Sequence, residues 1–170
     1  MIGLGRMGEG MSRRLIKHGH EVWGYRNNYE KACEQYEAGY ISGCTTSIQS
    51  LVQMIHSYKS VSERKPGVFM IAVPQENVEE TLDDLLRLCR EGDIIINYGN
   101  SNIEDCWKRE EHSAKFGVAY IDCDVDRNIC DMDSRYNLMV RGGDTAIATC
   151  KNIFHDLGTW KFTTKHSSVI

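Results

Sequence analysis

The chain has 170 residues, of which 41% are hydrophobic, and this suits a single folded domain with a buried core. Its net charge is −4 and its basic residues are scattered, which argues against a nucleic-acid-binding surface. No apolar run reaches the roughly 18 residues of a membrane span and no signal peptide is visible, so we expect a soluble, cytoplasmic protein.

A glycine motif stands at the start of the chain, where Gly3, Gly5 and Gly8 form the pattern G-x-G-x-x-G. Residues 1–2 have the character of a strand end, and residues 11–18 that of a helix. In a strand–turn–helix unit these glycines allow a tight turn, close approach of a pyrophosphate and close helix packing. The motif predicts a nucleotide site, with a plain glycine turn as the alternative. Because only two residues precede it, we expect the chain to begin upstream of this sequence.

Strand and helix patterns alternate along the rest of the chain. Strands are predicted for residues 20–25, 67–73, 94–96, 119–122 and 137–140. Helices are predicted for residues 29–38, 46–58, 78–89, 103–116 and 144–157. The expected helix caps are Thr46 with Gln49 as a capping box, Asn77, and Asn102 with Asp105 at its third position.

This alternation predicts an α/β fold: a doubly wound, mostly parallel Rossmann-type sheet in a single domain. The domain is expected to cover residues 1–157, and residues 158–170 are expected to form a loose polar tail. A sheet of this kind binds its ligand at the carboxyl ends of its strands.

The segment that follows the second predicted strand bears on the choice of nucleotide. Arg26, Asn27 and Asn28 occupy it, and it carries no Asp or Glu to accept a hydrogen bond from a free ribose 2′-hydroxyl. A guanidinium beside two amides suits a 2′-phosphate instead, so the sequence favours NADP over NAD. The alternative is that Arg26 is a solvated turn residue, which leaves the preference undecided.

The cysteines and the acidic residues are the candidate metal-binding and redox groups of the sequence. Seven cysteines form an odd set with no C-x-x-C pair, which argues against a disulfide framework or structural zinc and favours reduced thiols. Acidic side chains in residues 122–133 follow an EF-hand-like spacing, but Arg127 stands where such a loop needs glycine. We expect a solvated acidic loop and no metal site. Calcium binding, and a metal or redox role for Cys123 and Cys130, are the less favoured alternatives.

Six short motifs follow one another along the chain, at residues 3–8, 19–22, 25–27, 72–74, 99–102 and 138–140. In order and spacing they resemble the N-terminal domain of the decarboxylating 6-phosphogluconate dehydrogenases, and Gly-Asn-Ser-Asn at 99–102 is the most specific. The resemblance implies a Rossmann domain that binds NADP. In that family the reaction is oxidative decarboxylation of 6-phosphogluconate to ribulose 5-phosphate, a step of the pentose phosphate pathway.

The resemblance also implies roles for individual residues. The pyrophosphate would be held by Gly3, Gly5, Arg6, Met7 and Gly8, and the 2′-phosphate by Arg26, Asn27 and Asn28. The nicotinamide side would be lined by Val73 and Pro74, with Asn100 between nicotinamide and sugar acid and Ser101 next to it. The family's substrate loop aligns with Asp126, Arg127 and Asn128.

The sequence departs from the family pattern in three places. Tyr98 stands in the motif before Asn100 where the family has glycine, and we expect it to fill or reshape the pocket. Residues 126–128 replace a Ser-Gly-Gly loop, and their carboxylate would repel an anionic sugar phosphate. The helical domain that supplies the family's lysine and glutamate is absent from the 170 residues, so no catalytic residue is assigned.

Two functions remain open on these grounds. The first is the NADP(H)-binding domain of a phosphogluconate-dehydrogenase-like oxidoreductase, which is not expected to be catalytic alone. The alternative is a non-catalytic NADP(H)-binding structural or regulatory subunit of a larger assembly.

Overall fold

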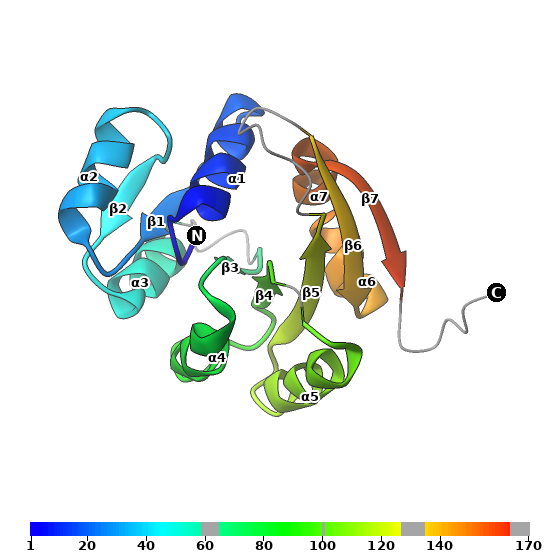
Figure 1. The fold of residues 1–170 in the computed structure, drawn as a ribbon. Helices are drawn as coiled ribbons and strands as arrows, with labels where there is room; N and C mark the ends of the chain where they lie inside the picture. The colour runs from blue at the N-terminus through cyan, green and yellow to red at the C-terminus, as the bar shows by residue number, and fades with distance from the viewer. Residues whose placement is uncertain (59–64, 100, 127–134, 164–170) are drawn as a thin grey trace.

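Helices and strands alternate through nearly the whole chain in the computed structural model, which describes residues 1–58, 65–99, 101–126 and 135–163 (Figure 1). The helices are α1 (Arg6–Lys17), α2 (Tyr29–Glu37), α3 (Ile48–Tyr58), the 3-10 turn η1 (Gln75–Asn77), α4 (Val78–Leu86), α5 (Ile103–Ala114), α6 (Asp144–Thr149) and α7 (Lys151–Leu157). The strands are β1 (Trp23–Tyr25), β2 (Gly43–Thr45), β3 (Val68–Ile71), β4 (Ile94–Asn97), β5 (Ala119–Val125), β6 (Tyr136–Gly142) and β7 (Gly158–Thr163).

The strands form two hydrogen-bonded groups that one residue joins. The first group is β1 beside β2, and the second has the order β3-β4-β5-β6-β7. Ile2 makes parallel bridges to both Tyr25 and Ile71, so the start of the chain lies between the two groups. All pairs are parallel except β5 with β6, which is antiparallel. The predicted doubly wound, mostly parallel α/β sheet is therefore confirmed.

Two layers of helices cover the sheet and enclose two hydrophobic clusters. The first cluster packs α1, α6 and α7 against one face, with Met11, Leu15 and Phe154 buried in it. The second packs α3 and α4 against the other face, through side chains such as Leu51 and Leu82. Figure 1 shows α1 and α7 side by side, on the opposite side of the central strands from α4. Every residue of β4 is buried, as its continuous apolar sequence predicts.

Helix capping agrees with the sequence only in part. Asn102 caps α5 as predicted, since its Oδ1 accepts from the Asp105 amide at 2.9 Å. The prediction for α3 was wrong: Ser47 and Ser50 exchange reciprocal hydrogen bonds there, at 3.0 and 3.1 Å, in place of Thr46 and Gln49. The Asn77 side chain makes no capping bond to α4, because η1 precedes that helix and Asn77 has a helical backbone conformation.

The end of the described chain also differs from the prediction. The expected helix over residues 144–157 is two helices that meet at Cys150. Residues 158–163 are not a loose tail but strand β7, which pairs in parallel with β6. The pairing is close at Gly158, where a Cβ would collide with the Tyr136 carbonyl oxygen. Residues 164–170 lie outside the described part.

In the part of the chain that the structure describes, no helix combines the length and apolar character needed to cross a membrane.

Candidate nucleotide-binding site

The glycine motif forms the turn between Ile2 and α1. Gly3 has a φ of +87°, and a Cβ on it would lie 2.5 Å from the Ala72 carbonyl oxygen. A Cβ on Gly8 would collide with the Gly3 carbonyl oxygen, so α1 packs directly on this turn. Gly5 differs from both, because a Cβ there would meet no protein atom within 4 Å. The open side of the turn is therefore at Gly5, where a ligand can come close to the backbone.

The N-terminus of α1 faces this turn and has the properties of an anion site. Gly5 is its N-cap and, having no side chain, makes no side-chain capping bond. The first-turn N–H groups have no partners within the helix, and together with the helix dipole they favour a negative charge. Arg6 is exposed beside them, while Met7 packs against the core and Gly8 is buried. Gly8 can thus take part only through backbone atoms, while the Met7 side chain is half-buried.

A cavity of about 500 Å³ opens beside this helix end. Seven of the residues predicted to bind the cofactor line this cavity: Gly3, Gly5, Arg26, Asn27, Asn28, Val73 and Pro74. It also has lining residues that the sequence reasoning did not find, namely Ile2, Leu4, Tyr25, Ile48, Ala72, Asn77, Glu80, Thr81 and Asp84. Asn77, Glu80 and Asp84 recur every three or four residues, so they share one face of the α4 segment. This helical spacing is the sequence pattern from which the contribution of α4 to the cavity could have been predicted. Asn100 lies outside the described residues.

Arg26 is held at the wall that α1 and β1 form. Its Nη1 donates to the Leu4 carbonyl oxygen at 3.1 Å, and the Gln35 amide donates to the same oxygen at 3.1 Å. The Asn28 side chain caps α2 by accepting from the Lys31 amide at 3.0 Å. Asn27 accepts from the Tyr25 hydroxyl at 3.2 Å. These bonds fix the segment against the glycine turn and leave further guanidinium and amide N–H donors for a ligand.

A buried polar cluster lies where β4 ends and α5 begins. The Asn97 amide donates to Ser101 Oγ at 3.2 Å and to Asp122 Oδ1 at 3.1 Å. Arg109 donates to Ser101 Oγ at 2.7 Å and pairs with Glu79 of α4 at 2.7 Å. Within the described residues, Oδ1 of Asn97 is buried and has no hydrogen-bond partner. The cluster therefore fixes the two ends of the turn that carries the family motif at residues 99–102.

Asp122 is the charged centre of that cluster and is fully buried. Burial raises the pKa of its carboxyl group, and hydrogen bonds from Asn97 and Ser101 oppose this shift. Arg141 approaches Asp122 at 3.5 Å but makes its shorter ion pair, 2.6 Å, with Asp124. The cluster thus holds a carboxyl group that takes up a proton more readily than an exposed one.

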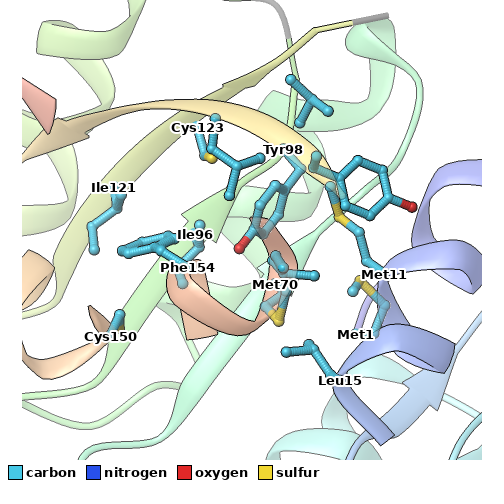
Figure 2. Packing of buried hydrophobic residues seen from close by; sticks show 14 of the residues in the cluster. Met1, Met11, Leu15, Met70, Ile96, Tyr98, Ile121, Cys123, Cys150 and Phe154 are labelled. Atoms are coloured by element: carbon cyan, nitrogen blue, oxygen red, sulfur yellow. The ribbon is translucent and has the colours of Figure 1, made fainter. Parts of the chain in front are cut away.

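Tyr98 does not fill the pocket, so the first of the two effects expected for it, filling or reshaping, is wrong. Its side chain is completely buried and points into the core, where Figure 2 shows it with Met11, Met70 and Phe154. The reason is the alternation of β4 and the residue that follows it: Tyr98 continues the core-facing side of Ile96. Burial raises the pKa of its hydroxyl well above the usual range.

A second cavity of about 540 Å³ lies at the end of β5, next to β6 and β7. Ser101 and Asp126, two of the predicted substrate residues, line it together with Asp124, Asn137 and Lys161. Arg127 and Asn128 lie outside the described residues. So do Cys130 and Asp133 of the EF-hand-like spacing, while Cys123 is fully buried in the core. Among the residues described, no group of three metal-ligating side chains comes together.

Comparison with known proteins identifies the same family that the sequence motifs resemble. The family model for the NAD binding domain of 6-phosphogluconate dehydrogenase matches residues 1–166. The chain is 27% identical over 157 residues to the decarboxylating 6-phosphogluconate dehydrogenase of Candida albicans, covering 92% of this chain and 30% of that protein. It is 27% identical over 159 residues to the NAD(+)-dependent, decarboxylating 6-phosphogluconate dehydrogenase of Haloferax volcanii, covering 94% and 49%.

The fold is similar to that of Plasmodium falciparum 6-phosphogluconate dehydrogenase, with a TM-score of 0.79 at 19% identity over 95% of this chain and 35% of that one. The chain spans half or less of the length of the curated relatives named here.

Proposed function

The chain belongs to the family of NAD-binding domains of 6-phosphogluconate dehydrogenase, and from this premise we propose that it binds NADP(H) in preference to NAD(H). We also propose that the β4–α5 turn receives the nicotinamide end, where a sugar-acid substrate would meet the cofactor. The observation that carries the proposal is the placement of Arg26 in the wall of the cavity at the α1 N-terminus.

The distribution of charge in the cavity supports this orientation. The α1 N-terminus, which has no side-chain capping bond, and Arg26 make part of the lining favourable to phosphates. Glu80 and Asp84 of α4 also line the cavity, and phosphates would be repelled at their side of it. The segment 26–28 carries no carboxylate that would accept from a free 2′-hydroxyl. A 2′-phosphate therefore has a favourable place at Arg26, and the pyrophosphate has one at Gly5.

The residues fit such a cofactor, and each has a definable task. Bound NADP+ supplies a hydride acceptor. Gly5 allows the pyrophosphate to approach the backbone, and the α1 N–H groups bind it. Val73 and Pro74, which follow β3, provide an apolar wall that can orient the nicotinamide and exclude water. Asn97 and Arg109 hold Ser101 beside the second cavity.

The second cavity favours a second candidate function. Asp124 and Asp126 both line it, and carboxylates are poor neighbours for an anionic sugar phosphate, although Arg141 pairs with Asp124 and Lys161 is also in the lining. Under this alternative the chain is a non-catalytic NADP(H)-binding module. It would retain the nucleotide site while binding no sugar acid.

Calorimetric titration of the full chain with NADP+ and NAD+ tests the proposal. We expect NADP+ to bind at least tenfold more tightly, because a charge-assisted contact to the 2′-phosphate is worth about 1.5–3 kcal/mol. Arg26→Ala should remove most of this advantage and change NAD+ affinity by less than about threefold. Lys31→Ala is the charge-matched control on exposed α2 surface and should change neither affinity.

Equal affinities for the two nucleotides, or equal losses in Arg26→Ala, would contradict the NADP preference. Adding 6-phosphogluconate to the NADPH-saturated chain separates the two candidates. A further rise in melting temperature supports a sugar-acid site, and no rise with NADPH binding intact supports the non-catalytic module.

A further inference from the structure

Two thiols lie in contact on the neighbouring elements α2 and β2. Cys33 is on α2 and Cys44 is on β2, and their Sγ atoms are 3.4 Å apart. Both side chains are half-buried, so small solutes can reach them. The Tyr29 hydroxyl contacts both sulfur atoms, and this contact raises the pKa of Tyr29 to about 12. The two cysteines thus form a pre-assembled pair.

The other described cysteines are in different surroundings. Cys106, Cys123 and Cys150 are buried in the protein interior. Cys89 is half-buried, and burial raises the pKa of its thiol to about 12. A thiol must ionise before it can attack a disulfide, so burial suppresses the reactivity of these four. Burial also raises the pKa of Cys44, and what distinguishes this cysteine is its contact with Cys33.

We propose that Cys33 and Cys44 are a redox modification site, at which a small-molecule disulfide such as glutathione disulfide converts the thiol pair to a reversible intramolecular disulfide. One thiolate attacks glutathione disulfide, forms a mixed disulfide and releases one glutathione thiolate. The second cysteine, as thiolate, then attacks the mixed disulfide at the protein sulfur and releases the second glutathione. Two protons leave the protein thiols, which are oxidised, and the oxidant is reduced to two glutathiones.

The geometry requires little movement for this step. An S–S bond is about 2.05 Å long, so the two sulfur atoms need to approach by only about 1.4 Å. The bond would tie α2 to β2, and α2 begins at Asn28, its N-cap and a lining residue of the cavity at the α1 N-terminus. The proposal does not depend on nucleotide binding, so its test is independent of the NADP titrations.

Peptide mapping of the full chain after incubation with glutathione disulfide tests the proposal. Remaining thiols are alkylated, and the chain is cut with a glutamate-specific protease. Glu34 and Glu37 lie between the two cysteines, whereas no Lys or Arg does, so this protease separates them and trypsin does not. We expect the peptides that carry Cys33 and Cys44 to be recovered as one cross-linked species, and dithiothreitol to release them.

Single substitutions supply the controls. Cys33→Ser and Cys44→Ser should each abolish the cross-link while circular dichroism shows that the fold is retained. Cys89→Ser should leave the cross-link unchanged. The proposal is overturned if Cys33 and Cys44 stay fully alkylatable, if they carry only glutathione adducts, or if either pairs with Cys130 or with a second chain.

Discussion

Gly8 and Gly5 belong to one motif, but the surroundings that a side chain would meet differ between them. Gly8 lies where α1 touches the turn, and any Cβ there would collide with the Gly3 carbonyl oxygen. Gly5 lies at the open end of the same helix, where a Cβ would meet no protein atom. Gly8 is needed to fold the site, and Gly5 leaves space for a ligand. The sequence motif names both residues but does not distinguish these roles.

Alanine substitutions separate the two roles. We expect Gly8→Ala to lower the free energy of unfolding by about 1–3 kcal/mol or more, because the added carbon overpacks the contact between α1 and the turn. Gly5→Ala should cost about 1 kcal/mol or less, because its φ of −75° suits alanine and the space is free, and the cost that remains is that alanine is a poorer N-cap than glycine. Urea unfolding measures both values.

For NADP+ affinity, we expect Gly5→Ala to have the larger effect of the two substitutions. Gly5→Ala should weaken NADP+ binding at least tenfold, because its methyl group occupies the position where the pyrophosphate approaches. Tight NADP+ binding by Gly5→Ala would show that the phosphates lie elsewhere in the cavity. A stable Gly8→Ala protein would mean that α1 can move away from the turn at little cost.

At the scale of the elements, the polar cluster around Asp122 connects β4, β5 and α5. Asn97 at the end of β4 and Tyr120 on β5 both donate to Asp122 Oδ1, at 3.1 and 3.3 Å. Ser101, at the start of α5, joins through Asn97 and Arg109. A buried carboxyl group held in this way makes stability depend on pH, because its pKa differs between the folded and unfolded chain.

Asp122→Asn tests this dependence. Burial raises the pKa of Asp122 above 3.8 in the folded protein, so the folded state keeps this proton to higher pH than the unfolded chain does. The contribution to stability is full below pH 3.8 and is lost as pH rises through the folded-state pKa. The free energy of unfolding of the wild type should therefore fall relative to Asp122→Asn as pH rises from 3.8 toward neutrality.

Urea unfolding of both proteins across this pH range measures the difference and cancels the effects of the other carboxyl groups. A difference that grows with pH in favour of the wild type would mean that Arg141 and Asn97 lower the pKa of Asp122 more than burial raises it.

Helix ends show how far local sequence rules reach. Asn102 and Asp105 were found from spacing alone, because their capping contacts are local and α5 starts directly after a loop. The cap of α3 was misplaced by one residue, since Thr46 and Ser47 are both good caps and spacing alone does not choose between them.

Tyr98 shows a different limit of prediction from sequence. The residue after a buried strand faces the core or the pocket according to the pleat of the strand, and a family motif does not state which.

At the scale of the whole molecule, the sequence predicts the central sheet better than its edge. Strands β3 and β4 are continuous apolar runs, which indicate burial on both faces. Strand β7 alternates polar and aromatic residues at the edge of the sheet, and its pairing with β6 depends on contacts that its own sequence does not encode. The pairing of β2, a three-residue strand at the opposite edge, likewise depends on contacts that its own short sequence does not encode.

The edge strand β7 extends the folded unit beyond Leu157, and truncation after Leu157 tests how much it contributes to stability. We expect the shortened chain to lose about 2–4 kcal/mol of unfolding free energy, because it loses the β6–β7 ladder and the packing of Trp160 on Phe154. Urea unfolding followed by far-ultraviolet circular dichroism measures the loss, and Trp160→Ala in the full chain isolates the side-chain part. If the truncated chain kept full stability, β7 would lie outside the cooperative unit, and the boundary expected from the sequence at residue 157 would be correct after all.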